Sequence, residues 1–407
     1  MNNLTISDDK IIDYFFSGET IRKKSYEIYQ LTLKNQTSFI LHEENLPLAA
    51  DFVAGVIREN YPDLKIPYHC RYNHFQGINT PRLNLINKKL SSLSSDEQLK
   101  SLIDLTIVSV LLDAGAGSAW KYHDQELNII NNRSEGLALA TMVMFQNGFF
   151  SDDHNRQLIV SSKKLKLISE QDLGTQMQVS ANNPMDGLTG RTLLLQKLGL
   201  HMENHRDIFP NSRPSDLFSN IKNEVNAEEI LKLLLIHLGP IWPSPIKINK
   251  VPMGDTWSYA KLSSNEKDQL VPFHKLSQWL SYSIIFLLEK FKIKVANIHQ
   301  LTGLPEYRNG GLFLDLNVIE LKPELIKSGI NQFAPDSPTI IEWRALTICL
   351  LDKIHPLICH IFHLDPKVFT LPQVLEGGTW LAGRKIAKQK RSDGGPPINI
   401  ISDGSVF

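Results

Sequence analysis

The strongest constraint on the fold is a helical spacing of apolar residues that recurs along most of the chain. Apolar side chains follow one another at intervals of three and four within residues 47–60, 99–111, 134–145, 227–238 and 272–289, which is the period of an α-helix. Strand-like runs are short and do not alternate regularly with these helices, which argues against a doubly wound parallel sheet. The sequence therefore predicts a compact, mainly α fold with a few short β-strands, of the α+β class.

Local signals predict where several elements begin and end. Ser95 and Gln98 have the spacing of a capping box ahead of the helix at 99–111. Ser337 followed by Pro338 is expected to open a long helix.

Other segments are predicted to be irregular. Residues 149–183 are expected to form short strands and turns, and a helix over Leu193–Leu198 is expected to stop at Gly199. In the helix at 272–289, polar residues that include Gln278 and Tyr282 are expected to share the face turned away from the core. We predict a single domain over residues 1–407, with two lobes and a soft boundary near 200–226.

Charge, hydropathy and cysteine usage exclude several classes of protein. The 43 basic and 43 acidic side chains cancel, so broad electrostatic binding of nucleic acid or of an anionic membrane is not expected. No apolar run approaches the roughly 18–20 residues of a membrane span, and the first residues lack the basic and apolar regions of an export signal. Cys70, Cys349 and Cys359 form no CxxC pair. We therefore expect a cytoplasmic protein.

No motif for a metal, a phosphate loop or a nucleophile is evident. His69, Cys70 and His74 do not have the spacing of a helical zinc site. The glycines at 115–117 and 310–311 match neither a P-loop nor a dinucleotide-binding fingerprint, and no serine stands in a GxSxG elbow. We therefore expect neither a metal nor a cofactor.

One short segment concentrates chemically active side chains. Residues 301–317 (LTGLPEYRNGGLFLDLN) are predicted to form a tight loop, broken by Gly and Pro, and then a short strand over 312–316. Positions 306–309 within it place an acid, a phenol, a guanidinium and an amide in succession. A turn does not need Tyr and Arg together. The alternative is an Arg that pairs locally with an acid and closes the loop.

A set of carboxylates lies beside Gly, Trp or strand-like segments: Asp113, Asp186, Asp255, Glu306, Asp315, Glu342, Glu376 and Asp403. Several of them could line one cavity, where a carboxylate activates a water and stabilises a positively charged, sugar-like transition state. Each acid taken alone also fits an N-cap or a salt-bridge partner. The residues by themselves therefore favour hydrolysis of a polar, ring-bearing molecule, and they leave the choice of acid open.

Ten blocks in one order resemble the uracil-catabolism (Urc) family, long known as a domain of unknown function. The blocks are IPYHCRYNHF (66–75), LLDAGAGSAWKY (111–122), RSEGLALATMVMF (133–145), QVSANNPMDGLTGR (178–191), LGPIWP (238–243), VPFHKLSQWLSYSI (271–284), LTGLPEYRNGGLFLDL (301–316), IEWRALTICLLDKI (341–354), LEGGTW (375–380) and GGPPINIISDGSVF (394–407). The resemblance covers nearly the whole chain. It implies a role in a pathway that converts uracil to its nucleotide, opens the ring and releases urea through ribosylurea-type intermediates. A member of this family could cleave the N-glycosidic bond of a ribosylurea phosphate.

A second resemblance points to the same reaction. VPFHKLSQWL, LPEYRNGG and IEWRALTICLLDKI are similar in order and spacing to segments of the queuosine-salvage proteins, which are helical nucleotide N-glycosidases related in shape to DNA glycosylases. The resemblance implies that five residues match that family's Lys, Asp, Arg, Glu and Arg, namely Lys275, Glu306, Arg308, Glu342 and Arg344. The Glu carries one methylene more than the family's Asp, and Asn-Gly-Gly replaces its Val-Pro-Gln. We therefore expect a different pocket floor and a different leaving group.

Together these observations define a candidate site. The predicted catalytic residues are Glu306, Glu342 and Asp113. The predicted substrate-binding residues are Lys275, Arg308, Tyr307, Asn309, His274, Phe273, Trp279, Trp120, His69 and Arg71. Glu306 is expected to stabilise an oxocarbenium-like sugar and to orient water. Lys275 and Arg308 are expected to hold a 5′-phosphate, and Glu342 is expected to orient Arg308 or Arg344.

Two other functions stay open on the sequence. A non-catalytic partner or carrier for the pathway's ring-opening, cyclohydrolase-like enzyme would show an exposed apolar patch and no deep polar pocket. A phosphoribosyltransferase acting on uracil would share the substrate class, but its loop motif is missing. The expected partners are a small nucleotide-derived substrate and the ring-opening enzyme. We expect neither nucleic acid nor a membrane as a partner, and we expect the protein to be a monomer or a homodimer.

Overall fold

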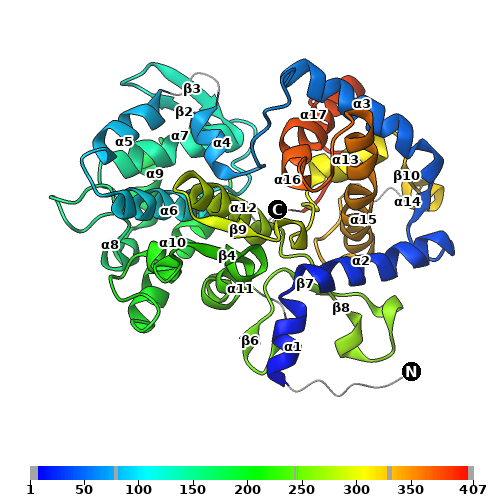
Figure 1. The fold of residues 1–407 in the computed structure, drawn as a ribbon, viewed down its shortest axis with the longest axis horizontal. Helices are drawn as coiled ribbons and strands as arrows, with labels where there is room; N and C mark the ends of the chain where they lie inside the picture. The colour runs from blue at the N-terminus through cyan, green and yellow to red at the C-terminus, as the bar shows by residue number, and fades with distance from the viewer. Residues whose placement is uncertain (1–7, 78–80, 243, 245, 328–331, 402–407) are drawn as a thin grey trace. The chain divides into compact units, whose positions relative to one another are not determined.

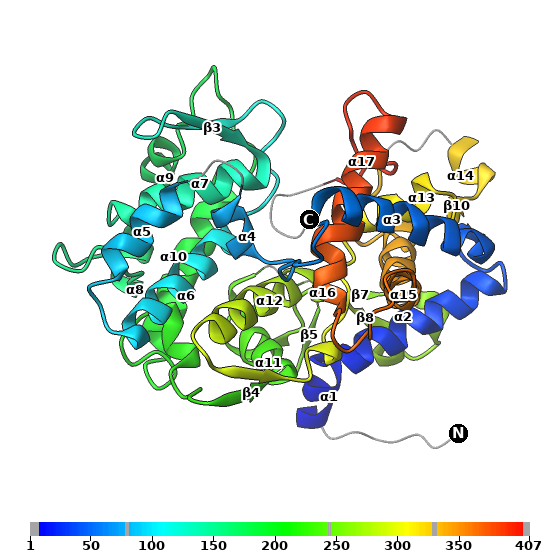
Figure 2. The ribbon, with the colours of Figure 1, turned by 45° about the horizontal axis from the view of Figure 1, so that its top comes forward.

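The computed structural model describes residues 8–77, 81–242, 244, 246–327 and 332–401. They form two compact units. Unit 1 contains residues 8–69, 244–278 and 297–401, and unit 2 contains residues 70–242 and 279–296. Both are built mainly from helices with a few short strands (Figures 1 and 2), which confirms the predicted fold class. Residues 200–226, where the sequence suggests a soft boundary, lie within unit 2.

The elements of unit 1 gather around one long helix. Its helices are α1 (Asp8–Phe15), α2 (Gly18–Leu33), α3 (Leu46–Asn60), α13 (Tyr307–Asp315), α14 (Pro323–Lys327), α15 (Pro338–Ile361), α16 (Leu371–Val374) and α17 (Trp380–Lys390). Its strands form antiparallel pairs: β1 (Phe39–Leu41) with β10 (Ile319–Leu321), β5 (Lys247–Ile248) with β6 (Val251–Pro252), and β7 (Thr256–Ser258) with β8 (Leu270–Pro272). Helix α12 (Lys275–Lys290) begins in unit 1 and continues in unit 2.

Helix α15 is the core of unit 1. The Ser337 side chain accepts the Ile340 N–H at its start, and Pro338 is the first helical residue, as the sequence predicts. Helices α2, α3 and α13 pack against α15 (Figure 1). A buried apolar cluster joins it to α2 and to the β7–β8 pair: Ile21, Ile28, Tyr259, Val271, Phe273, Ile341, Ala345 and Ile348. Within the described ranges, Pro338–Phe362 is the one helix long and apolar enough to cross a membrane, which corrects the expectation that no apolar run approaches that length. In this structure, 56% of its most apolar window is buried inside the protein.

Unit 2 is a second helical assembly. Its helices are α4 (Arg71–Gln76), α5 (Arg82–Leu90), α6 (Ser95–Leu111), α7 (Arg133–Gln146), α8 (Ser162–Leu167), α9 (Glu170–Gln176), α10 (Leu188–Asn204) and α11 (Ala227–His237). Its strands are the antiparallel hairpin β2 (Lys121–Asp124) and β3 (Ile129–Asn132), and the parallel pair β4 (Glu224–Asn226) and β9 (Lys294–Ala296).

Helix α6 is buried on nearly all sides, and Asp104, its one buried acid, therefore requires a partner. Asp104 is fully buried and accepts hydrogen bonds from the Arg213 Nε (2.8 Å) and the Ser215 backbone N–H (2.9 Å). Burial raises the Asp104 pKa, and the Arg213 charge opposes that rise. The cap of this helix differs from the prediction by one residue, because Ser94 and not Ser95 accepts the Glu97 N–H.

Three sequence-based predictions of irregular structure or strand are wrong. Residues 149–183 contain helices α8 and α9, each opened by a serine N-cap. Gly199 does not end its helix, because α10 continues to Asn204. Since Gly199 has no side chain, α10 can pack closely on α8 at this position. The apolar residues at 312–316 fall mostly in helix α13 and not in a strand, and the strand, β10, follows at 319–321.

Burial corrects a further expectation about α12, and one candidate carboxylate lies outside the described residues. Gln278 and Tyr282 were expected on the outward face of α12, but both are fully buried. Gln278 exchanges hydrogen bonds with Thr302, which satisfies its amide in the interior of unit 1. Near the C-terminus, Phe333 and Ile400 form an isolated β-bridge, and the candidate carboxylate Asp403 lies outside the described residues.

An ion pair fixes the start of α12 to α15. Both oxygens of Asp255 accept from the Arg344 guanidinium, at 2.7 and 2.6 Å, and Asp255 also accepts the Lys275 backbone N–H at 3.0 Å. The Arg344 guanidinium lies over the Phe273 ring, 4.1 Å from its centre. Burial by itself would raise the Asp255 pKa, but the Arg344 charge and these hydrogen bonds hold it well below its usual range.

We expect Asp255→Asn to lower the free energy of unfolding by roughly 3–5 kcal/mol near neutral pH, because it leaves the buried Arg344 without its counter-charge. A carboxyl with a lowered folded-state pKa contributes stability above its unfolded pKa of about 3.9, and loses it as the pH falls through the folded-state value. The difference between wild type and variant should therefore be constant from about pH 5 to about pH 8 and shrink below about pH 4. Urea denaturation followed by tryptophan fluorescence measures it.

The matched control is Asp51→Asn, an exposed acid on α3, which should change stability by less than about 0.5 kcal/mol at every pH. An equal loss in both variants, or a pH-independent loss in Asp255→Asn, would contradict the assignment of this ion pair.

Candidate functional site

The structure separates the sequence-predicted site residues into groups. In unit 1, one group surrounds Glu306, and another surrounds the Asp255–Arg344 ion pair and contains Phe273 and His274. Glu342 makes a third set of contacts. Arg71, Asp113, Trp279 and Trp120 belong to unit 2.

Glu306 is the N-cap of helix α13, and this contact fixes its carboxylate. Its Oε1 accepts the Asn309 N–H at 2.7 Å, and its Oε2 accepts the Arg308 N–H at 2.9 Å. Burial raises the Glu306 pKa above its usual value, while those two N–H groups and the positive charges of Lys275 and His69 act in the opposite direction. Glu306, Lys275 and His69, which are far apart in the sequence, are therefore electrostatic neighbours. We call them, with Glu376, the Glu306 cluster.

A second carboxylate enters the cluster through His69. The His69 Nδ1 lies 2.6 Å from the Glu376 Oε2, and the imidazole is almost fully buried. The ring also packs against the indole of Trp380, with ring centres 5.4 Å apart. The Arg384 guanidinium lies on Trp380, 4.8 Å from its centre. Sequence reasoning placed Glu376 among several carboxylates without giving it a role. Its pairing with His69 was not readable, because the two residues are 307 positions apart.

Glu376 lies on a π-helical turn, Leu375–Thr379, between α16 and α17. Such turns are rare and occur often at functional sites. Gly377 within it has no room for a side chain, because a Cβ there would lie 2.7 Å from Ile66. Close packing of the turn on the segment that leads to His69 therefore brings the two partners together.

Asn309 connects this turn to Glu306. Its side chain accepts from the Thr379 hydroxyl at 2.9 Å and donates to the Leu304 carbonyl at 3.1 Å, while its backbone N–H binds Glu306. Asn309 is fully buried. A predicted substrate-binding amide is thus a structural link that fixes the two carboxylate-bearing segments relative to each other.

Arg308 and Tyr307 take different positions. Arg308 is mostly buried, donates from Nη1 to the Gly394 carbonyl (2.7 Å), and lies over the Tyr307 ring, 4.7 Å from its centre. Tyr307 is partly exposed. The guanidinium therefore secures the segment after α17.

Glu342 does not orient Arg308 or Arg344. Its carboxylate, fully buried in α15, accepts from the Ser38 N–H (2.7 Å), the Tyr259 hydroxyl (2.5 Å) and Lys261 (3.3 Å). Burial and the Glu342 charge raise the Tyr259 pKa. Glu342 thus joins α15 to the segments around β1 and β7, a structural role that its place early in a helix did not reveal.

Phe273 and His274 support the ion pair of unit 1. Phe273 underlies the Arg344 guanidinium, and the His274 Nε2 lies 3.0 Å from the Phe15 carbonyl oxygen. Burial lowers the His274 pKa, which favours the neutral ring.

Arg71, Asp113 and Trp279 meet in unit 2. Arg71 is fully buried and donates to Ser109 (2.8 Å), Asp113 (2.8 Å) and Ser134 (2.9 Å). The Ser134 hydroxyl in turn lies 2.7 and 2.8 Å from the two Asp113 oxygens. The Arg71 guanidinium lies 5.8 Å from the centre of the Trp279 ring. Burial lowers the Arg71 pKa, and the charge of Asp113 opposes this. We call this group the Arg71 cluster.

Trp120 has a structural position in unit 2. It is fully buried and donates from its indole N–H to the Met177 carbonyl at 2.9 Å. No group of His, Cys, Asp and Glu that could hold a metal ion occurs among the described residues.

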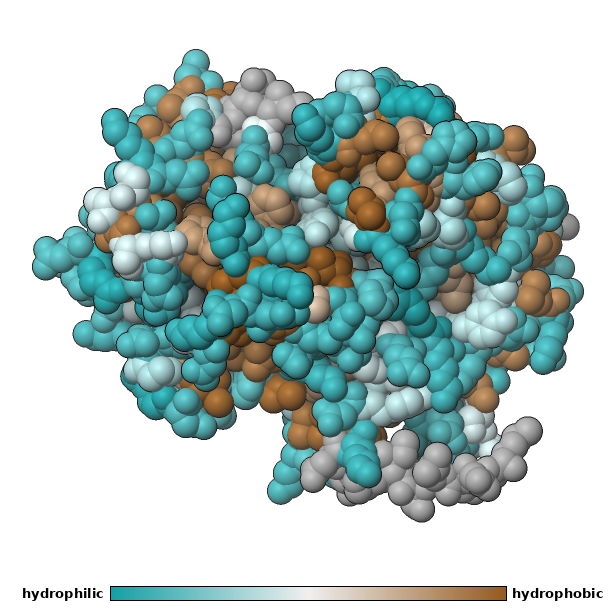
Figure 3. All heavy atoms as spheres, in the orientation of Figure 1, coloured by the Kyte–Doolittle hydropathy of each residue, from teal (hydrophilic) through white to brown (hydrophobic). Residues whose placement is uncertain are grey.

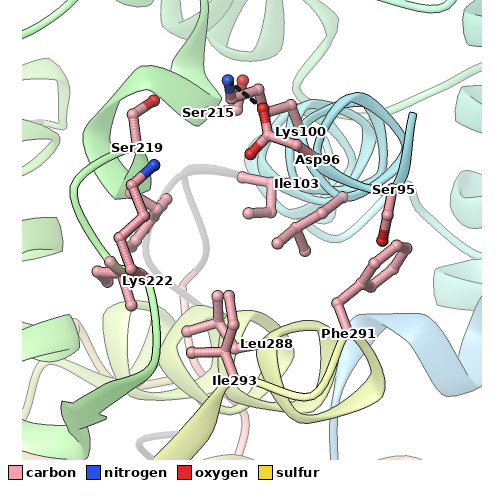
Figure 4. A pocket seen from close by; sticks show the side chains of 13 residues that line it. Ser95, Asp96, Lys100, Ile103, Ser215, Ser219, Lys222, Leu288, Phe291 and Ile293 are labelled. Atoms are coloured by element: carbon pink, nitrogen blue, oxygen red, sulfur yellow. Dashed lines mark ion pairs between the residues drawn. The ribbon is translucent and has the colours of Figure 1, made fainter. Parts of the chain in front are cut away.

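Unit 2 also contains a hollow of about 180 Å³ between α6, the segment after Pro214 and the end of α12 (Figure 4). Its lining mixes apolar side chains with Lys222 and with the ion pair between Asp96 and Lys100, at 2.6 Å. None of the sequence-predicted site residues lines it. Asp96, the carboxylate among its lining residues, is exposed and paired with Lys100.

The described residues define a mainly helical protein in which the half-buried Glu306 and the buried Glu376 are held beside a histidine and a lysine. The chain matches the family described as "Protein of unknown function (DUF1688)" over residues 14–407, and it belongs to that family. Protein urg3 of Schizosaccharomyces pombe is 40% identical over 403 residues, which cover 96% of this chain and 98% of the relative. Uracil catabolism protein 4 of Lachancea kluyveri is 35% identical over 439 residues, which cover 98% and 99%. These relatives confirm the family resemblance found in the sequence.

The packing of α17 on α13 generates a test of how the cluster is held. A side chain on Gly383 of α17 would collide with the Arg308 carbonyl of α13. We expect Gly383→Ala to destabilise the protein by roughly 1–3 kcal/mol, because it pushes apart the helices on either side of the cluster. Thermal denaturation measures this.

Gly190→Ala serves as a control in which the expected change in stability has the opposite sign. Gly190 lies inside helix α10 with open space around it, so alanine should stabilise the protein by up to about 1 kcal/mol. Changes of the same sign in the two variants would contradict the close approach of α13 and α17.

Proposed function

We propose that this protein acts in uracil catabolism as a hydrolase that cleaves the ribosyl N-glycosidic bond of a uracil-derived ribosylurea 5′-phosphate, with release of urea or a ureide. The relative named Uracil catabolism protein 4 supports the pathway. The observation that carries the reaction is the Glu306 carboxylate, which is fixed at a helix N-terminus beside Lys275 and His69.

A purely structural N-cap does not account for Glu306. Asn, Asp, Ser and Thr are preferred at this position, because their shorter side chains reach the first N–H groups. Burial of a carboxylate is unfavourable and is not needed for capping. Here the acid is half-buried, and burial raises its pKa. A half-buried carboxylate with a shifted pKa next to a cation and a histidine is the pattern found at sites of proton transfer.

The proposed chemistry follows from this arrangement. As the bond between the sugar C1′ and the nitrogen breaks, positive charge develops on the ribose ring. The ionised Glu306 stabilises that charge, because it is held in place before the reaction begins. It also accepts a proton from the water that attacks C1′. The product is ribose 5-phosphate.

Lys275 is the proposed cation for the 5′-phosphate. Its ammonium lies in the electrostatic surroundings of Glu306, and its backbone is fixed by Asp255. Arg308, whose Nη1 donates to the Gly394 carbonyl, is expected to share this role. Lys275 acts as a point charge, and the planar Arg308 guanidinium acts as a directional donor.

Glu306→Gln should reduce hydrolysis of synthetic ribosylurea 5′-phosphate by roughly 100- to 10,000-fold, because the amide neither takes a proton nor stabilises the sugar cation. Mass spectrometry of urea and ribose 5-phosphate measures the rate. The exposed Glu266→Gln variant serves as control and should keep full activity. Unchanged turnover in Glu306→Gln contradicts the role. Binding without turnover by the wild type would favour the carrier function instead.

Lys275→Met should shift the acid limb of the kcat/KM profile to higher pH. The Lys275 charge lowers the Glu306 pKa, so its removal leaves the burial effect less opposed and Glu306 becomes protonated at a higher pH. The KM should rise for the phosphorylated substrate and stay the same for the nucleoside without phosphate. The exposed Lys367→Met should change neither quantity. An acid limb that moves to lower pH would contradict the placement of Lys275 beside Glu306.

A further inference from the structure

The proposed hydrolysis needs a second proton-transferring group. The nitrogen of a urea is a poor leaving group unless it is protonated as the bond breaks. Glu306 cannot supply that proton while it is ionised and accepts one from water. The acid must therefore be another residue close to Glu306.

We infer that His69 is the acid that protonates the leaving nitrogen, and that Glu376 is the residue that positions His69. The inference rests on the proposed N-glycosidase function and adds two residues to it. His69 was expected only to bind substrate, and Glu376 was given no role.

The geometry of His69 fits this assignment. The Nδ1 of its ring is fixed by the Glu376 Oε2 at 2.6 Å, and its backbone N–H donates to the Pro372 carbonyl at 2.9 Å. Trp380 packs against the ring. A carboxylate on one ring nitrogen stabilises the charged imidazolium and sets the ring orientation, so that the other nitrogen, Nε2, can donate. This is the arrangement of an oriented general acid.

The position of Glu376 also favours a functional role. It lies on the π-helical turn, where glycines pack tightly on neighbouring segments. Burial and the Glu376 charge raise the pKa of nearby Tyr61 to about 12, so Glu376 acts there as a negative charge. A buried His–Glu pair that served packing alone would be replaceable by apolar side chains at little or no loss.

His69 and Glu306 share one electrostatic environment. The positive charge of His69 lowers the Glu306 pKa, so a protonated His69 and an ionised Glu306 favour each other. Asn309 links their supporting segments through Thr379 and the Glu306 N-cap contact. A protonated acid and an ionised base are the pair of states that this hydrolysis requires.

The step balances as a hydrolysis. The bond from C1′ to nitrogen breaks, its electron pair goes to the nitrogen, and the His69 Nε2 proton forms the new N–H bond. The oxygen of water bonds to C1′, and one of its protons goes to Glu306. Urea and ribose 5-phosphate leave, and exchange with solvent returns a proton to His69 and removes one from Glu306.

A substrate that needs no acid separates this inference from the proposed function. We would compare ribosylurea 5′-phosphate with 4-nitrophenyl riboside 5′-phosphate, whose phenolate leaves without protonation. His69→Asn should lower kcat/KM for the ureide by roughly 100-fold or more and for the nitrophenyl compound by less than about threefold. Glu306→Gln should lose both activities. His299→Asn, an exposed histidine in the same unit, should lose neither.

Glu376 is tested by the pH profile. Glu376→Gln should shift the basic limb of ureide hydrolysis to lower pH, because the charge that stabilises the protonated imidazole is gone, while the nitrophenyl rate stays near that of wild type. Glu376→Asp should restore part of the wild-type profile.

The outcomes distinguish the possible failures. Equal losses of kcat/KM for both substrates in His69→Asn would overturn the acid role of His69 and show a structural one. Full ureide turnover in His69→Asn would assign the acid to another residue. An unchanged basic limb in Glu376→Gln would overturn its positioning role. If the wild type hydrolyses neither compound, the proposed function fails, and this inference fails with it.

Discussion

The ion pair between Asp255 and Arg344 is the interaction on which the organisation of unit 1 most depends. It joins the long central helix α15 to the start of α12, because Asp255 also accepts the backbone N–H of Lys275, the first residue of α12. A buried guanidinium is unfavourable unless both faces and edges find partners. Arg344 finds a carboxylate at its edge and the Phe273 ring on its face. The sequence places these residues about 90 positions apart, so no local signal marks the pair.

The Glu306 cluster depends on close backbone packing as much as on charge. Helix α13 lies near enough to α17 that only glycine fits at position 383, and the π-helical turn packs on neighbouring segments in the same way. Asn309 then connects the turn to the Glu306 N-cap. Because each contact fixes the next, the carboxylates and His69 are oriented before any ligand binds, which is the condition for electrostatic stabilisation of a transition state.

Hydrophilic residues cover much of the face drawn in Figure 3, with hydrophobic ones placed among them. Polar chemistry lies inside each unit: the Glu306 cluster in unit 1 and the Arg71 cluster in unit 2. In both, an ionisable side chain is buried with its partners, and the Arg71 guanidinium keeps its Nη2 without a hydrogen-bond partner in the described part of the chain.

Local patterns in the sequence determined most helices, because apolar period and capping act over a few residues. Residues 46–60, 133–146 and 227–237 are helical close to the predicted bounds, and the long helix α15 begins at Pro338 as predicted. The errors arose where a short apolar run fits a helix or a strand equally well, as at 312–316, and where a glycine packs against a neighbouring helix, as at 199.

The candidate site residues also divide into those that the sequence singled out and those whose partners only the structure revealed. The segment 306–309, Lys275 and His69 stood out by residue type and family resemblance, and in the structure the charges of Lys275 and His69 lower the Glu306 pKa against the effect of burial. Only tertiary structure decided which acid partners which base. Glu342 binds Ser38, Tyr259 and Lys261, and Glu376, which had no role, pairs with His69. A carboxylate carries the same chemistry at every position in a sequence, so its role depends on the neighbours that folding provides.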